Sequence, residues 1–143
     1  MNRHYYFFPE INKNSGYGHF FRVIKYSYYL RGKIFFILKS KISKNLMYQL
    51  KSKKIGFISL KNLKQIKKSN SYLVIDSYST IPRTLKKIKF RKIFLISDKK
   101  PIKNKSDVIV DHTFGRKIKF YDKEISNGIK CFVGVNYFPF GIK

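Results

Sequence analysis

The stretch Tyr72-Leu73-Val74-Ile75-Asp76 decides the fold class of this chain of 143 residues. Its four consecutive aromatic and apolar side chains predict a strand that is buried on both faces, because a half-exposed strand alternates apolar and polar residues. Strands of this kind belong to parallel sheets that helices cover on both sides. Asp76 then marks the end of the strand, where such sheets bind their ligands.

Further short apolar runs lie on both sides of this strand, separated by stretches with helical spacing. We expect the other strands over residues 4–8, 33–38, 55–59, 92–96, 107–111 and 130–134. We expect helices over residues 20–30, 43–54, 60–69 and 80–88, with Ser43 as an N-cap and Gly32 as the stop after the first helix. The pattern predicts an α/β fold with a Rossmann-like, doubly wound and mostly parallel sheet, in one domain of residues 1–143.

Charge is the most unusual feature of the composition. The chain has 32 Lys and Arg against 7 Asp and Glu, a net charge of +25, and chains this basic usually meet polyanions. However, only six of the 32 are Arg, and the many Lys, Ile, Asn, Phe and Tyr residues are typical of an A/T-rich genome. Nucleic acid is the least expected partner, because the charges are spread along the chain and Arg forks are few.

The single cysteine and the apolar runs exclude several classes of protein. Cys131 has no second cysteine to pair with, and no group of residues has metal-ligand spacing, so we expect neither a metal nor a cofactor. The longest apolar run, residues 34–38, is far shorter than the roughly 20 residues of a membrane-spanning helix. The first residues lack a secretory signal pattern. We therefore expect a cytoplasmic chain.

The segment Gly16-Tyr17-Gly18-His19 lies between the first expected strand and the first expected helix. Glycine allows a backbone to approach a ligand closely, and free amides at a helix N-terminus favour phosphate oxygens. His19 would lie in the first helical turn and face the carboxyl edge of the sheet. The positive end of the helix tends to keep its imidazole neutral, which suits a general base. A glycine turn followed by a surface histidine is the alternative.

The stretch from Gly16 to Arg22 resembles the Gly-x-Gly-His-x-x-Arg signature of the UDP-sugar hydrolases of pseudaminic-acid biosynthesis. Three further segments resemble blocks of the same family and follow in the same order. They are Val74-Ile75-Asp76-Ser77-Tyr78 for an Asp-x-Tyr block, Ser106-Asp107-Val108-Ile109-Val110-Asp111 for an Ala/Cys-Asp-x-x-x-Asp strand, and Gly134-Val135-Asn136-Tyr137 for a Gly-x-x-Tyr block.

This resemblance implies the amino-terminal lobe of a two-lobed, glycosyltransferase-B-type fold. The implied reaction splits a UDP-linked 2,4-diacetamido-2,4,6-trideoxy sugar into UDP and free sugar without a metal. The implied catalytic residues are His19, which activates water, and Tyr78, which touches the sugar or the diphosphate. Gly16 and Gly18 would line the phosphate-side loop. The remaining candidates for substrate binding are Arg22, Asp76, Asp111 and Tyr137.

Three carboxylates lie at the ends of expected strands: Asp76 and Asp111 each end a strand, and Asp98 follows one. Each can face the ligand-binding carboxyl edge of the sheet and share acid–base chemistry there, or can accept a hydrogen bond from a backbone amide in its own loop. We favour the second interpretation for Asp111. For the neighbouring His112 we favour a solvated loop histidine over a second base.

Three functions remain open at this point. The first is a truncated or split UDP-sugar hydrolase, whose second, nucleotide-binding lobe is not in this sequence. The second is the acceptor-side subunit of a two-part glycosyltransferase, in which His19 would deprotonate an acceptor hydroxyl. The third is a basic nucleic-acid-binding protein. For the first two, the expected partners are a nucleotide-sugar substrate and either a separately encoded second lobe or a second copy of the chain.

Overall fold

A computed structural model describes residues 3–11, 17–67, 70–99 and 105–139 of the chain. The strands are β1 His4–Pro9, β2 Lys33–Leu38, β3 Gly56–Ser59, β4 Ser71–Asp76, β5 Lys92–Ile96, β6 Val108–Asp111 and β7 Lys130–Val133. The α-helices are α1 Gly18–Ser27, α2 Lys44–Ser52, α3 Arg83–Lys86 and α4 Asp122–Ser126. Three 3₁₀ segments complete the elements, namely η1 Leu60–Gln65, η2 Ile118–Tyr121 and η3 Val135–Tyr137.

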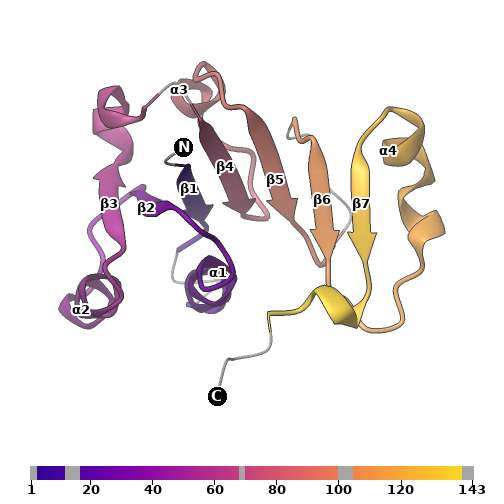
Figure 1. Cartoon of the computed structure of the whole chain (residues 1–143), viewed down its shortest axis with the longest axis horizontal. Coiled ribbons are helices and arrows are strands. Elements are labelled where there is room, and N and C mark those ends of the chain that lie inside the picture. Colours follow the sequence, from indigo (N-terminus) through magenta and orange to yellow (C-terminus); the bar gives the residue numbers. More distant parts are fainter. Residues whose placement is uncertain (1–2, 12–16, 68–69, 100–104, 140–143) are drawn as a thin grey trace.

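The seven strands form one parallel sheet in the order β3-β2-β1-β4-β5-β6-β7 (Figure 1). The chain runs outward from β1 to β3 and then returns to place β4 on the other side of β1. Pro9 at the end of β1 pairs in register with Asp76 at the end of β4. This reversal of strand order is the point at which doubly wound sheets bind ligands, outside the carboxyl ends of the strands. The expected α/β, Rossmann-like fold is confirmed.

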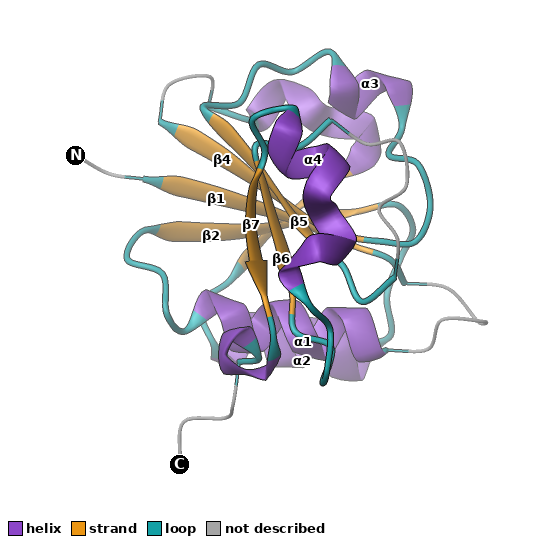
Figure 2. Ribbon diagram, turned by 90° about the vertical axis from the view of Figure 1, so that its right-hand side faces the viewer, coloured by secondary structure: helices purple, strands orange, loops and turns teal. Residues whose placement is uncertain are grey.

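Helices cover both faces of the sheet (Figure 2). On one face, Phe20 of α1 and Leu50 of α2 are fully buried and belong to the same cluster as Phe7 of β1. On the other face, Leu85 of α3 and Tyr121 of η2 join a second cluster. Both layers therefore bury apolar side chains against the sheet, at roughly 1.5–3 kcal/mol for each fully buried aliphatic or aromatic side chain.

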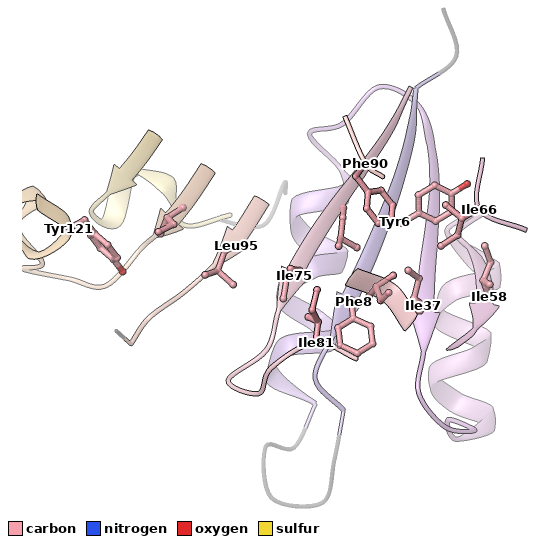
Figure 3. Close-up of a cluster of buried hydrophobic side chains, with 13 residues drawn as sticks. Tyr6, Phe8, Ile37, Ile58, Ile66, Ile75, Ile81, Phe90, Leu95 and Tyr121 are labelled. Carbon is pink, nitrogen blue, oxygen red and sulfur yellow. The ribbon is translucent and has the colours of Figure 1, made fainter. Parts of the chain in front are cut away.

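The central strands supply both clusters by simple alternation. Leu73 and Ile75 of β4 point to the second cluster, where Figure 3 shows Ile75 near Ile81, whereas Val74 points to the first. Tyr6 and Phe8 of β1 alternate with Tyr5 and Phe7 in the same way. The burial of residues 72–76 on both faces, which the sequence predicts, is confirmed because helices lie on both sides of β4.

The helices agree less well with the sequence than the strands do. Every strand begins and ends within one residue of its expected bounds. The expected helix over residues 60–69 is only the 3₁₀ segment η1, which is kinked at Asn62, a residue whose side chain competes with helical backbone hydrogen bonds. The expected helix over residues 80–88 shortens to α3, with Pro82 just before it. The chain after β6 forms η2, α4 and η3, which the sequence analysis did not predict.

Among the described residues, no helix combines the length and the apolar character that crossing a membrane requires.

Gly32 has a different role from the helix stop that the sequence predicts, because α1 already ends at Ser27. Its φ is +158°, and a Cβ at this position would lie 2.6 Å from the backbone oxygen of Arg3. The close approach brings the chain into β2 alongside the start of β1, since the amide of Lys33 donates to the same oxygen.

We expect Gly32→Ala to lower the free energy of unfolding by about 1–3 kcal/mol, because a backbone atom must move to admit the new methyl group. Urea denaturation followed by circular dichroism measures this change. Gly18→Ala is the matched control, since a Cβ at Gly18 would meet nothing within 4 Å and should be neutral or slightly stabilising. Equal stability of the two variants would contradict the role given to Gly32.

Candidate functional site

A buried hydrogen bond joins α1 to β4 at the reversal of strand order. The side chain of His19, in the first turn of α1, places Nδ1 2.6 Å from Oδ1 of Asp76, and the two residues are 4% and 0% exposed. Nη2 of Arg22 lies 3.0 Å from the same Nδ1, and both nitrogens face Oδ1 of Asp76, which only accepts hydrogen bonds when it is ionised. The tautomer with its proton on Nδ1 can donate to this oxygen. That tautomer has its lone pair on Nε2, which bonds to no described residue.

Arg22 lies one helical turn after His19 and completes the pairing of Asp76. Its Nε donates to Oδ2 of Asp76 at 2.7 Å, Nη2 donates to Oδ1 at 2.5 Å, and Nη1 donates to Asp98 at 3.2 Å. Burial lowers the pKa of the Arg22 guanidinium, but the hydrogen bonds and charges of Asp76 and Asp98 outweigh it and raise the pKa above its ordinary value. Arg22 is therefore a permanent, partly buried cation that two carboxylates hold.

Tyr78 lies against the ring of His19 from the loop after β4. The two ring centroids are 4.6 Å apart in an edge-to-face arrangement, and the Tyr78 hydroxyl donates to Oδ2 of Asp98 at 2.9 Å. Burial, and then the hydrogen bond to Asp98, raise the pKa of Tyr78, so the phenol keeps its proton. Burial raises the pKa of Asp98, but Tyr78 and Arg22 outweigh it and lower the pKa, so Asp98 stays ionised.

His112 also belongs to this cluster, so the expectation of a solvated loop histidine is wrong. The loop after β6 places Nε2 of His112 3.3 Å from Nη1 of Arg22. The ring centroids of His112 and Phe138 are 5.0 Å apart. Burial, and then the positive charge of Arg22, lower the pKa of His112 and favour the neutral ring. The signal in the sequence was its position directly after a buried strand, at the same edge as the other candidates.

Glu10 is a further member of the site that the sequence analysis did not identify, although it directly follows β1. Its carboxylate accepts hydrogen bonds from the Tyr78 amide at 2.7 Å, the Ser77 hydroxyl at 2.9 Å and the Ser79 hydroxyl at 3.1 Å. Burial raises the pKa of Glu10, but these three hydrogen bonds outweigh it, and the net shift is downward. Glu10 therefore fixes the loop that presents Tyr78.

Two buried polar atoms of the site lack a hydrogen-bond partner among the described residues, namely Oδ1 of Asp98 and Nδ1 of His112. Most buried polar atoms in folded proteins are satisfied by protein or by ordered water. These two atoms therefore offer an acceptor and a ring nitrogen to water or to a ligand beside Arg22.

The other candidates lie outside this cluster. Asp111 accepts hydrogen bonds from the Thr113 amide at 2.8 Å and the Tyr121 hydroxyl at 2.7 Å, and lies 3.1 Å from Nε of Arg116, so it stabilises its own loop. Tyr137 is 43% exposed and packs 5.4 Å from Phe132.

The glycines of the motif are described only in part. Gly18 begins α1, and its φ is not positive, so neither the backbone nor the packing requires glycine there. Gly16 lies outside the described residues. No side chain of the described residues caps α1, and the first amides of this ten-residue helix lie beside His19, where they can donate to an anion.

The arrangement can therefore move a proton and can bind an anion. Nε2 of His19 can accept a proton, Asp76 can stabilise the resulting imidazolium, and the start of α1 can bind a negatively charged group. Within the described residues, no group of three or more His, Cys, Asp or Glu side chains is arranged to hold a metal ion.

Comparison of the chain with protein-family models, with curated proteins and with solved structures finds no match.

We expect Arg22→Gln to destabilise the protein by about 3–5 kcal/mol, because it leaves the buried Asp76 carboxylate without its cation. Arg22→Lys should rescue little of this loss, since one ammonium group cannot replace a bidentate fork. Urea denaturation measures both variants against Arg31→Gln, an exposed arginine whose loss should change stability by less than about 0.5 kcal/mol. A loss no larger than that of Arg31→Gln would refute the pairing.

The lowered pKa of His112 predicts a loss of stability in acid. The folded protein holds His112 neutral, whereas the unfolded chain protonates it below its ordinary pKa of 6.5, so stability falls as the pH drops from there through the folded pKa. Arg22 opposes the protonation of His112, while Asp76, Asp98 and Asp111 favour it.

We expect the melting temperature of His112→Gln to fall less than that of the wild type between about pH 7.5 and about pH 5. One titrating group can contribute no more than about 1.4 kcal/mol per pH unit. Parallel pH profiles of the two proteins would show that His112 does not titrate in this way.

Proposed function

We propose that this chain hydrolyses a UDP-linked 2,4-diacetamido-2,4,6-trideoxy sugar to UDP and the free sugar in the cytoplasm. In this proposal it is the amino-terminal lobe of a glycosyltransferase-B-type fold. The single observation that supports it most is the 2.6 Å hydrogen bond from His19 to the fully buried Asp76, at the reversal of strand order.

The hydrogen bond gives His19 the properties of a general base. Asp76 fixes the imidazole with its proton on Nδ1, which leaves Nε2 to accept a proton from water. The water oxygen attacks the anomeric carbon, and the bond from that carbon to the diphosphate oxygen breaks. UDP leaves with the bonding electrons, and the imidazolium is stabilised by the Asp76 carboxylate until it loses its proton to solvent.

The surroundings of His19 suit a diphosphate leaving group. The first turn of α1, which no described side chain caps, supplies backbone amides, and no described atom lies within 4 Å of the position that a Cβ at Gly18 would take, which favours a close approach. The Tyr78 hydroxyl donates its one proton to Asp98, so toward a substrate its oxygen can accept a hydrogen bond from a sugar hydroxyl. Arg22 acts here as a positioning residue, because its guanidinium is already bonded to Asp76 and Asp98 and aligns the carboxylate that orients His19.

The test is release of UDP from the UDP-sugar by the purified chain, measured by chromatography with and without the product of a neighbouring reading frame. We expect His19→Ala to lower the rate by about 10²–10⁴-fold, the usual contribution of a general base. His4→Gln is the matched control. It removes a similarly buried imidazole, 5% exposed, at the start of β1, on the side of the sheet where the strands begin and away from the candidate site.

Melting curves of both variants verify that each is folded. Wild-type release by a folded His19→Ala variant, or no release by the wild type under either condition, would refute the proposal. Sugar transfer that occurs only when a lipid or sugar acceptor is added would instead favour the acceptor-side subunit of a glycosyltransferase.

A further inference from the structure

Apart from the candidate site, a recess lies at the β3 side of the sheet, between α2, the end of β2 and the edge strand β3. Its volume is about 1140 Å³. Five lysines line it, and all are exposed, namely Lys39, Lys41, Lys44, Lys51 and Lys61. Two exposed aromatic residues, Tyr48 and Phe57, line it as well. We call this recess the lysine groove.

The lysine groove has no neutralising charge. No Asp or Glu occurs between Glu10 and Asp76, so every charged side chain of the elements that form the groove is a cation. None of the five lysines pairs with a carboxylate among the described residues. Cations collected in a concave surface reinforce one another and raise the local concentration of anions. The groove therefore favours a ligand with several negative charges.

The two aromatic rings point into the same space from different elements. Phe57 pairs in register with Phe36, which packs in the cluster that contains α2, so Phe57 faces α2 from the edge of the sheet. Tyr48 projects from α2 and is 68% exposed, while Phe57 is 46% exposed. Exposed rings among lysines are the arrangement on which unpaired bases stack while ammonium groups contact phosphates.

We propose that the lysine groove binds single-stranded nucleic acid without sequence preference, independently of the proposed hydrolysis. Lysines act as point charges toward phosphates and do not read base edges bidentately, so the contacts favour a backbone rather than a sequence. A recess suits a single strand better than a lipid surface, which a protein meets with a protruding apolar or basic face.

Folding brings the lysines together into a dense patch of positive charge, which the sequence alone does not show. The five lysines are spread over residues 39–61, and the same spacing along an open chain is a diffuse charge. The turn from β2 into α2 and the return through β3 into η1 place them around one recess. Nucleic acid, the least expected partner from the sequence, becomes the partner that this surface fits.

The test measures the fluorescence anisotropy of a labelled oligothymidylate of about 20 nucleotides. With five phosphate contacts, raising NaCl from about 50 to about 200 mM should weaken binding by about 100-fold. Replacing all five groove lysines with Gln should weaken binding by at least about tenfold in low salt and flatten the salt dependence. The matched control replaces five exposed lysines elsewhere, Lys87, Lys89, Lys119, Lys123 and Lys130, and gives the same net charge.

A second variant separates stacking from charge. Tyr48→Ala with Phe57→Ala should weaken oligothymidylate binding by at least about tenfold and leave inorganic polyphosphate binding unchanged. Equal losses in the two lysine sets would mean that net charge alone binds the oligonucleotide, and would overturn the proposal. Wild-type affinity of the folded aromatic variant would overturn it too, as would binding to phosphatidylglycerol vesicles with none to the oligonucleotide.

Discussion

The carboxylate of Asp76 is the group on which the site depends. It is fully buried, and an isolated carboxylate cannot remain ionised in such a place without partners. Both partners come from α1, 54 and 57 residues earlier in the chain, so the pairing fixes the helix against the end of β4. The same contacts orient the imidazole of His19. One electrostatic requirement thus sets both the packing of α1 and the geometry of the candidate base.

The carboxyl edge of the sheet contains two regions that differ in how their positive charges are paired and exposed. At the end of β4 and β5, Arg22 is neutralised by two carboxylates and shielded from water. At the end of β2 and β3, lysines that pair with no carboxylate in the described part of the chain surround an open groove. Buried charge of the first kind fixes geometry, whereas exposed charge of the second kind attracts ligands. The edge can therefore offer a positioned proton acceptor and a polyanion surface on one fold.

The strands and part of the site could be predicted because their signals are local. Runs such as Tyr72–Asp76 and Lys33–Leu38 are apolar throughout, which only a doubly covered strand requires. Asp76 ends β4, Tyr78 lies in the loop after β4, and His19 lies at the start of the helix that follows β1. Parallel strands bring their carboxyl ends to one edge of the sheet. Glu10 and His112 also follow strands, but nothing local marks which polar atoms they contact. The prediction of a helix over residues 60–69 was wrong although Leu, Lys and Gln are good helix formers, because Asn62 has a non-helical backbone conformation and interrupts the segment.

The sequence by itself determined the parallel α/β sheet, because the period and length of apolar runs depend only on neighbouring residues. It also determined which end of the sheet holds the polar residues. Only the tertiary structure decided that Arg22 is enclosed by Asp76 and Asp98 rather than free for a ligand, and that His112 joins them. Only the tertiary structure gathered the five groove lysines around Tyr48 and Phe57. These outcomes depend on strand order and on distances between residues far apart in the chain, which no local pattern encodes.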